Sequence, residues 1–573
     1  MSLYLCTDVY TKGRHNFKFG ALIARQQLYT LGSGFPRGSV TFANLSSFLQ
    51  GQTSTYTALS RTKPDRTYHY NLLGFYLQDD FRALPNLTLN LGLRYEFHTD
   101  VNEVYGNGVA LRDIHRDAAF TPGLAFQNPS LGSLGPRFGF AWDVRGDGKT
   151  AVRGGFGMMY DIGNVGSLLI ISKGGQPPLL GLSTVATPGT LSLPLFFPPA
   201  ALGRLARTVD YNLRQTHMLS YNLTLERQLP ANMAVSLAYA GSRGLNLIQN
   251  PNANPSIPTV LPDGRQFWPG ATDPEGRPVV PPSPAPPRPN PIWDQGMIYS
   301  GSGDSWYNSF QFVLTKRLSQ GLEFNSAYTF GRLIDTCAQV SSAGEAGGSR
   351  CSASTVIPNS YDKGLSDWNV THSWRFSAIY HFPERSGLGR LAGSLLNGWW
   401  AGGILSTQTG LPLTTYLSAI RSRRGEAAGL DRPNLVAGRS NENIVKGTTA
   451  GCTGVAAGRK LGTPNLYYDP CAFSIPLAGF LGNLGRDTLT APGLFNLDFS
   501  VVKDTALPFL GEAGKLQFRA EIFNILNRPN FSRPAFTVFA GTADVQAPLS
   551  NAGQVTATDT KSRQVQLALK IVF

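Results

Sequence analysis

The sequence predicts an all-β protein, an antiparallel transmembrane β-barrel with long extracellular loops. Three observations support this prediction: dense period-two alternation, an unusual composition, and a regular succession of short turns and long connections. Successive side chains of a strand point to opposite faces, so alternating apolar and polar residues give a sheet one apolar and one polar face. In a membrane barrel the apolar face contacts lipid and the polar face lines the lumen.

The composition excludes a helical membrane protein and is unusual for a soluble domain. Charged residues make up 15% of the 573 residues, against roughly 25% in a typical soluble domain. The mean hydropathy is −0.12, and no apolar run reaches the ~18 residues that a transmembrane helix requires. Because lipid offers the backbone no hydrogen-bonding partners, a membrane protein of this composition would have to be a barrel.

Alternating segments recur along the chain and define the expected strands. In segment 86–97 every odd position is apolar and every even position is polar or glycine. Arg and Glu occur only on the polar side of such segments. We expect roughly fifteen strands of about ten residues each. The other clearly alternating segments are 219–226, 305–312, 374–382, 495–501 and 516–522.

Short turns and long Gly/Pro-rich connections separate these strands. Compact soluble domains rarely contain several long connections, whereas outer-membrane barrels combine short periplasmic turns with long outer loops. Counting strands back from a periplasmic C-terminus places every short turn in the periplasm and every long connection outside. The short turns are at 83–85, 145–148, 229–232 and 319–321, and the long connections span about 100–134, 161–213, 250–303, 335–370 and 410–494.

The last strand carries an apolar face up to the final residue of the chain. A soluble chain commonly ends in a polar, frayed tail. An amphipathic last strand with a terminal Phe is common in bacterial outer-membrane barrels and resembles the signal that their assembly machinery reads. We therefore expect five residues of this strand to form a barrel-assembly signal: Val565, Leu567, Leu569, Ile571 and Phe573.

The five cysteines include two local pairs and no C-x-x-C motif. Cys337 and Cys351 lie in one Gly/Ser-rich connection, and Cys452 and Cys471 lie in another. Two local pairs in outer loops are consistent with disulfides in an oxidising compartment. Free thiols are the alternative, because the sequence does not give the geometry that a disulfide requires. Cys6 has no evident partner.

No motif indicates catalysis, a cofactor or a metal. Segment 147–150 resembles the end of a phosphate-binding loop, but Asp143 stands where the leading glycine belongs, so a hairpin turn is the better interpretation. The seven histidines show no metal-ligand spacing.

The net charge of +14 is dispersed, with one short basic cluster at 421–424. Solvated loops and a polar lumen explain this charge better than nucleic acid does. We expect no enzyme, no cofactor and no nucleic-acid partner.

Several sequence stretches are distinctive as a set: 12–20, 74–81, 87–96, 135–139, 239–244, 398–403, 410–412, 519–527 and 564–567. Together they resemble the barrel of Oar-like TonB-dependent outer-membrane transporters and receptors. In that family a signal peptide, often a regulatory-like sandwich domain, a TonB box and a plug domain precede a barrel of about 22 strands. Residues 1–573 match none of these preceding parts. We therefore interpret them as one TonB-dependent transporter barrel domain that is truncated at its N-terminus, with roughly 15 of the expected 22 strands.

The resemblance implies uptake across the bacterial outer membrane. The complete protein would bind a small-molecule, glycan or peptide ligand with its outer loops. The energy-transducing TonB complex would drive uptake only if the N-terminal part is present, so this fragment is expected to be inactive in energised transport. The other expected partners are outer-membrane lipid and the barrel-assembly machinery. The alternatives are a passive porin-like channel or a surface-binding, adhesive barrel, and, third, a soluble β-propeller or sandwich.

Overall fold

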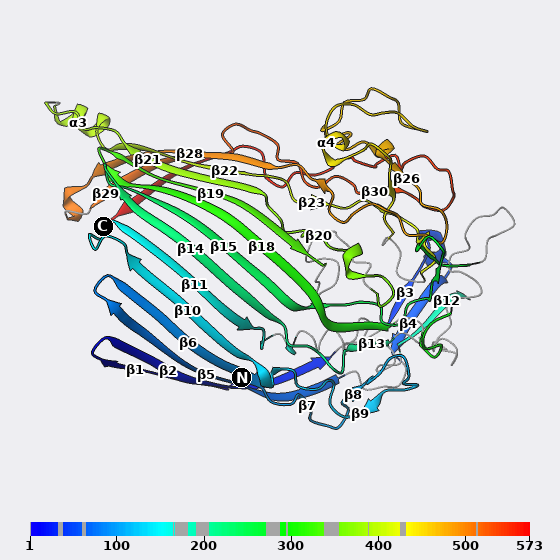
Figure 1. Cartoon of the computed structure of the whole chain (residues 1–573). Coiled ribbons are helices and arrows are strands. Elements are labelled where there is room, and N and C mark those ends of the chain that lie inside the picture. The colour runs from blue at the N-terminus through cyan, green and yellow to red at the C-terminus, as the bar shows by residue number, and fades with distance from the viewer. Residues whose placement is uncertain are drawn as a thin grey trace.

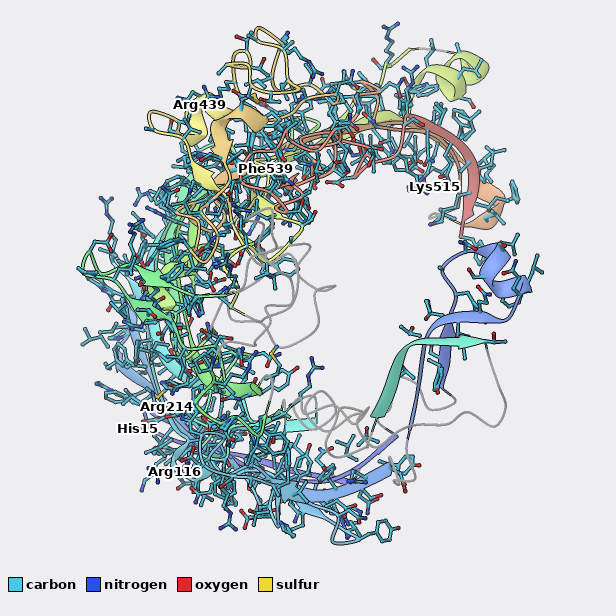
Figure 2. All side chains as sticks on the ribbon, turned by 90° about the vertical axis from the view of Figure 1, so that its right-hand side faces the viewer. His15, Arg116, Arg214, Arg439, Lys515 and Phe539 are labelled. Atoms are coloured by element: carbon cyan, nitrogen blue, oxygen red, sulfur yellow. A yellow bond between two sulfur atoms is a disulfide. The ribbon has the colours of Figure 1, made fainter. Side chains whose placement is uncertain are left out.

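The large antiparallel sheet dominates the computed structural model and curves around a central axis (Figures 1 and 2). In the part of the chain that the structure describes, the sheet has 18 strands, of which three are short. The structure describes residues 2–31, 38–59, 65–163, 165–166, 182–190, 206–270, 287–293, 296–336, 354–387, 389–424, 431–511 and 514–573.

Fifteen strands of the described residues form the wall, so the predicted number of roughly fifteen is confirmed. They are β1 (Ser2–Lys12), β2 (His15–Leu31), β5 (Asp65–Leu84), β6 (Leu87–His98), β10 (Leu134–Asp143), β11 (Thr150–Tyr160), β14 (His217–Leu229), β15 (Met233–Gln249), β18 (Gly296–Ser319), β19 (Leu322–Asp335), β21 (His372–His381), β22 (Trp399–Gln408), β28 (Leu494–Ala506), β29 (Lys515–Phe523) and β31 (Gln564–Val572).

Each wall strand pairs antiparallel with the wall strand before it and the one after it. Among the described residues, β1 pairs only with β2, and β31 pairs only with β29. The wall therefore has two edge strands, one at each end of the chain.

Turns and loops separate to opposite ends of the wall, as the alternation of connection lengths predicts. The short turns, such as 85–86 and 320–321, lie together at one end, which Figure 1 shows on the left. Loops lie at the other end. One connection at the turn end is longer than expected, because residues 382–398 contain helix α3 (Arg390–Leu396). The side chain of Asn397 stabilises this connection by two hydrogen bonds with the backbone of Arg385, at 2.9 and 3.1 Å.

The loops contain short elements of their own. None of the described helices is long and apolar enough to cross a membrane. The short elements are β3 (Ser39–Thr41), α1 (Leu45–Leu49), β4 (Gln52–Leu59), β7 (Asn102–Glu103), β8 (Val109–Ala110), β9 (Thr121–Pro122), η1 (Ser130–Gly132), β12 (Leu182–Thr190), β13 (Ala206–Val209), β16 (Thr259–Val260), β17 (Gln266–Phe267), η3 (Asn359–Tyr361), β20 (Gly364–Leu365), β23 (Pro412–Leu413), β24 (Tyr416–Leu417), β25 (Asn434–Leu435), α4 (Asn441–Ile444), η4 (Pro470–Ala472), β26 (Phe473–Ser474), β27 (Leu489–Thr490) and β30 (Thr537–Phe539), with η5 (Pro508–Leu510) at the turn end.

The two faces of the wall differ in polarity as predicted. One face carries large apolar side chains that are exposed in the isolated chain, and the strand register places them side by side across neighbouring strands. The opposite face carries carboxylates, amides and hydroxyls. A lipid-facing outer surface and a wet lumen account for this pattern. The apolar face includes Leu91, Phe138, Phe156, Leu223, Phe310 and Phe330.

Among the described residues, three clusters of buried apolar side chains lie at the loop end of the wall. One packs Tyr68 of β5 and Tyr299 of β18 against loop residues such as Phe126. A second packs connection 409–493 against connection 524–563, with Leu417 and Val538 fully buried. A third surrounds Trp293. The described parts of the connections are therefore packed, which the Gly/Pro-rich sequence did not lead us to expect.

Candidate functional site

The lumen wall carries a fixed network of polar side chains at β2, β5 and β6. Lys18 donates a hydrogen bond to the carboxylate of Asp80 at 2.7 Å. Gln78 and Asn90 donate to the other oxygen of Asp80 at 2.8 and 2.6 Å. One strand away, Arg94 pairs with Glu96 at 2.5 Å. Because each charge has a partner, this part of the wall is polar without a concentrated charge of either sign.

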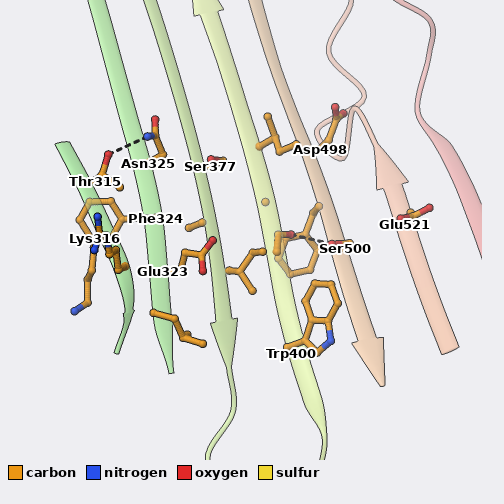
Figure 3. A pocket seen from close by; sticks show the side chains of 18 of the residues that line it. Thr315, Lys316, Glu323, Phe324, Asn325, Ser377, Trp400, Asp498, Ser500 and Glu521 are labelled. Atoms are coloured by element: carbon orange, nitrogen blue, oxygen red, sulfur yellow. Dashed lines mark hydrogen bonds between the residues drawn. The ribbon is translucent and has the colours of Figure 1, made fainter. Parts of the chain in front are cut away.

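A hollow of about 570 Å³ lies against strands β18, β19, β21, β22, β28 and β29 (Figure 3). Three acids line it: Glu323, Asp498 and Glu521. Asp498 is held in place because its Oδ1 accepts hydrogen bonds from the backbone of Asn524 at 2.8 Å and from Asn496 at 2.9 Å. Trp400 supplies an aromatic surface beside these acids. The hollow can contact a polar or cationic group that passes along the lumen.

Buried ion pairs stabilise the outer loops, one within a connection and one between two connections. Arg424 pairs with Asp431 at 3.1 Å, and Arg432 pairs with Asp362 of the preceding long connection at 3.1 Å. Both pairs are almost completely buried, with side chains at most 3% exposed. We name the loop assembly held by these pairs, formed by the described residues of 354–371, 409–493 and 524–563, the outer-loop cap.

Asp431 organises the centre of the outer-loop cap. Its carboxylate accepts hydrogen bonds from the backbone and hydroxyl of Ser422 at 2.6 and 2.8 Å, in addition to the pair with Arg424. Arg432 lies 3.8 Å from the ring centroid of Tyr361. Burial raises the pKa of Tyr361, and the nearby Arg432 opposes this rise. A buried carboxylate is stable only when such partners replace its water.

Arg421 and Arg486 connect the outer-loop cap to other segments. Arg421 contacts the carboxylate of Asp544 in connection 524–563, and Arg486 pairs with Asp335 at the end of β19. Burial lowers the pKa of Arg421, and the neighbouring Arg423 lowers it further. Burial also acts to lower the pKa of Arg486, but Asp335 and Asp487 outweigh burial and raise it. Solvated loops, which we expect to carry much of the dispersed basic charge, do not account for cluster 421–424, because Arg421 and Arg424 are each 1% exposed.

A disulfide joins Cys452 to Cys471 inside the outer-loop cap, with a Cα–Cα distance of 5.6 Å. Next to it, Asp469 accepts hydrogen bonds from the backbone of Ala450 and of Cys471 at 3.1 and 3.0 Å, and pairs with Arg439 at 2.5 Å. This part of the loop is therefore tied by a covalent bond and by charge. Cys6 is a free, exposed thiol. The other predicted pair, Cys337 and Cys351, lies outside the described residues.

Of the five residues predicted as an assembly signal, four lie on one face of β31 and Phe573 directly follows the strand; each of the five is more than half exposed. The strand is the edge of the wall and pairs in register with β29, so that Leu567 lies opposite Ala520 and Leu569 opposite Phe518. This geometry presents an apolar face and a free backbone edge together. The role of these residues as an assembly signal stays a prediction.

The sequence did not identify Asp362, Asp431 and Asp469 as a set, although they hold the outer-loop cap together. Acids and arginines within connections otherwise rich in Gly and Pro are the signal that could have identified them.

In the described part of the chain, no group of three or more His, Cys, Asp or Glu side chains could hold a metal ion. Segment 147–150 covers the end of the hairpin turn between β10 and β11 and the first residue of β11, and in this turn Asp143 accepts hydrogen bonds from the backbone of Gly146 and Gly148.

A family model described as outer membrane beta barrel domain matches residues 7–566. A comparison with curated proteins finds no match. Similar solved structures include the outer membrane transporter YddB from Escherichia coli (11% identity, TM-score 0.47, 99% of this chain and 53% of that chain). They also include the siderophore receptor PiuA from Acinetobacter baumannii (10% identity, TM-score 0.41, 99% and 55%) and the ferripyoverdine receptor from Pseudomonas aeruginosa (10% identity, TM-score 0.44, 99% and 47%). The chain spans about half the length of these structures.

Proposed function

Because the chain belongs to the outer membrane beta barrel domain family, and so lies in the bacterial outer membrane, we propose that residues 1–573 are the barrel domain of a TonB-dependent receptor that imports a ligand. The outer loops bind the ligand, and the polar lumen is its route inward. The ligand is not changed chemically. Import is driven by the TonB complex when a plug-bearing N-terminal part is present.

The observation that carries this proposal is the construction of the outer-loop cap. A passive pore requires little more than an open polar channel, whereas selective capture of a scarce ligand requires binding groups held in fixed positions. Buried pairs such as Arg424–Asp431 and the disulfide Cys452–Cys471 supply that rigidity at the outer end of the wall. The lumen acids Glu323 and Asp498 then lie on the path toward the periplasm.

The outer-loop cap also contains a candidate contact for an anionic ligand group. Among the described residues, the Nη1 of Arg421 has no hydrogen-bond partner, and the Asp544 carboxylate that touches this side chain is itself 66% exposed. A carboxylate or phosphate of a ligand could replace Asp544, because planar guanidinium groups pair well with both anions.

Uptake measurements in cells with and without TonB test the proposal. Cells would produce the chain together with any plug-bearing segment encoded upstream, and uptake of labelled ferric siderophores, oligosaccharides and peptides would be measured. We expect saturable uptake of one ligand class that requires TonB and is lost in the Asp431→Asn variant. Uptake that rises linearly with concentration, independent of TonB and of Asp431, would instead show a passive channel.

A further inference from the structure

Three basic side chains gather around Trp306 on the lipid-facing surface of the wall. The guanidinium of Arg243 lies 5.3 Å from the centroid of the Trp306 ring, and the ammonium of Lys363 lies 4.3 Å from it. Arg332 pairs in register with Asn308, two residues from Trp306 on the same face of β18. Arg243, Arg332 and Lys363 are all exposed. We name these three residues and Trp306 the basic rim patch.

The strand register shows that the basic rim patch belongs to the lipid-facing surface. Arg243 of β15 is directly opposite Trp306, and two pairs further along the same face Tyr239 is opposite Phe310. Phe310 in turn is opposite Phe330 of β19. These three aromatic rings are 46–47% exposed on the apolar surface of the wall.

The basic rim patch lies where the apolar surface meets the loop end. Trp306 is four residues beyond Phe310 toward the loops, which corresponds to about 13 Å along a strand. Trp side chains favour the membrane–water interface, and Lys and Arg extend their charged ends to it from an apolar surface. The loops point outward in the assigned orientation, so this interface is that of the outer leaflet.

The described acids near the basic rim patch leave its charge uncompensated. Asp362 directly precedes Lys363 but pairs with Arg432, and Asp335 at the end of β19 pairs with Arg486. Within the described residues, no ion pair joins Arg243, Arg332 or Lys363 to a carboxylate, Asp304 of the same strand included. Three adjacent cations at a membrane surface attract an anionic partner.

We propose that the basic rim patch binds the phosphate-bearing head group of a lipid in the outer leaflet. Arg243 and Lys363, which both contact Trp306, bind the phosphate. Arg332 is a third donor and lies nearer the membrane centre. The lipid chains lie along Tyr239, Phe310 and Phe330. Charge-assisted hydrogen bonds from Arg to phosphate are among the strongest polar contacts. The proposal rests on the membrane location and is independent of the imported ligand.

Native mass spectrometry of the full chain, folded in dodecylmaltoside micelles, tests this proposal. Lipid A with both phosphates is the probe, and lipid A without phosphates is its neutral counterpart. The full chain should bind the phosphorylated lipid at least tenfold more tightly than the neutral one. The double variant Arg243→Gln/Lys363→Gln should bind it at least tenfold more weakly than the unaltered chain.

Arg375→Gln is the matched control, because Arg375 is a cation of strand β21 on the lumen face and donates to Ser406 at 2.8 Å. It should bind the phosphorylated lipid within twofold of the unaltered chain. Strand content measured by circular dichroism confirms folding, and the single variant Lys363→Gln, which alters one exposed side chain, replaces the double variant if the latter does not fold. The proposal is overturned if the phosphates make no difference, if the patch variants bind as tightly as the unaltered chain, or if Arg375→Gln loses as much affinity.

Discussion

At the scale of single residues, the outer-loop cap depends on charges that are buried together with their partners. Removing a carboxylate from water costs several kcal/mol, and only a close cation and further hydrogen bonds offset that cost. Asp431 is fully buried and has both, from Arg424 and from Ser422. Such a pair adds little net stability, but breaking it is costly because one charge stays buried.

The Asp431→Asn substitution should destabilise the outer-loop cap by about 3–5 kcal/mol, because the buried Arg424 then faces a neutral amide in place of a carboxylate. Hydrogen exchange should accelerate in residues 411–424 and 431–436 and remain slow in the wall strands. Asp263→Asn is the control, since Asp263 forms an exposed pair with Arg265, and it should leave exchange in the outer-loop cap unchanged. Equal exchange in the two variants would refute a structural role for Asp431.

The Cys452–Cys471 disulfide closes a segment with a sequence separation of 19 residues. A crosslink of that span stabilises by about 3 kcal/mol, chiefly by restricting the unfolded loop. Replacing both cysteines by serine should therefore increase protease cleavage between residues 452 and 471 while the wall stays folded. Peptide mapping without reductant should recover the two cysteines in one linked peptide. Recovery of both as free thiols would contradict the disulfide.

At the scale of elements, β31 combines two properties that are unfavourable in a soluble protein. Within the described residues it is an edge strand whose second backbone edge pairs with no other strand, and it exposes Leu567 at 68% and Leu569 at 71%. In water such an edge promotes aggregation. In a bilayer the apolar face is stabilised by lipid, so the strand indicates a membrane environment.

The stability lost when a charged residue is introduced into β31 should depend on which face of the strand carries the charge. Leu567→Arg places the charge on the lipid-facing side and should cost about 2–4 kcal/mol if the residue lies near the bilayer centre. Gln566→Arg, one residue away on the lumen side, should cost little. Urea titration of the chain folded in phospholipid vesicles measures both. Similar losses in the two variants would show that this face does not contact lipid.

Deletion of Phe573 tests the predicted assembly signal separately from stability. Phe573 is 89% exposed and lies beyond the last paired residue of β31, so its loss removes little packing. We expect lower amounts of the chain in the outer membrane of cells, with unchanged folding of the purified chain into vesicles. Unchanged amounts in cells would refute the assembly role.

At the scale of the whole molecule, the chain reverses the usual distribution of polarity in its wall and keeps a conventional core only in its loops. Large apolar side chains such as Phe310 face outward, while residues such as Leu417 and Val538 pack at the loop end. The wall is stabilised by strand pairing and lipid contact, and the loops by buried apolar area and paired charges. Variants in the outer-loop cap should therefore impair binding without unfolding the wall.

The wall could be predicted from sequence because its signals are local. Segment 516–522 predicts β29 (Lys515–Phe523) within one residue at each end, since alternation and pairing obey the same period of two. The predicted segment 305–312 is much shorter than β18 (Gly296–Ser319), because the end of that strand beyond the membrane need not alternate.

The outer-loop cap could not be predicted, because its contacts join distant residues that have no local pattern. Arg432 and Asp362 are 70 residues apart, and Arg421 contacts Asp544 although two wall strands, β28 and β29, separate them in the sequence. A basic cluster such as 421–424 has the same sequence pattern whether water or buried carboxylates surround it. Only the folded arrangement of several loops distinguishes the two cases.

The most direct test of the account is the orientation of the chain in intact cells. Single reactive cysteines would be introduced as Arg116→Cys in connection 99–133 and as Asp147→Cys in turn 144–149, both in chains with Cys6→Ser, Cys337→Ser and Cys351→Ser, and reacted with a membrane-impermeant maleimide. A transmembrane barrel with its loops outside should be labelled at position 116 in intact cells and at position 147 only after the outer membrane is permeabilised. Equal labelling of both positions in intact cells would contradict a transmembrane barrel with its loops outside.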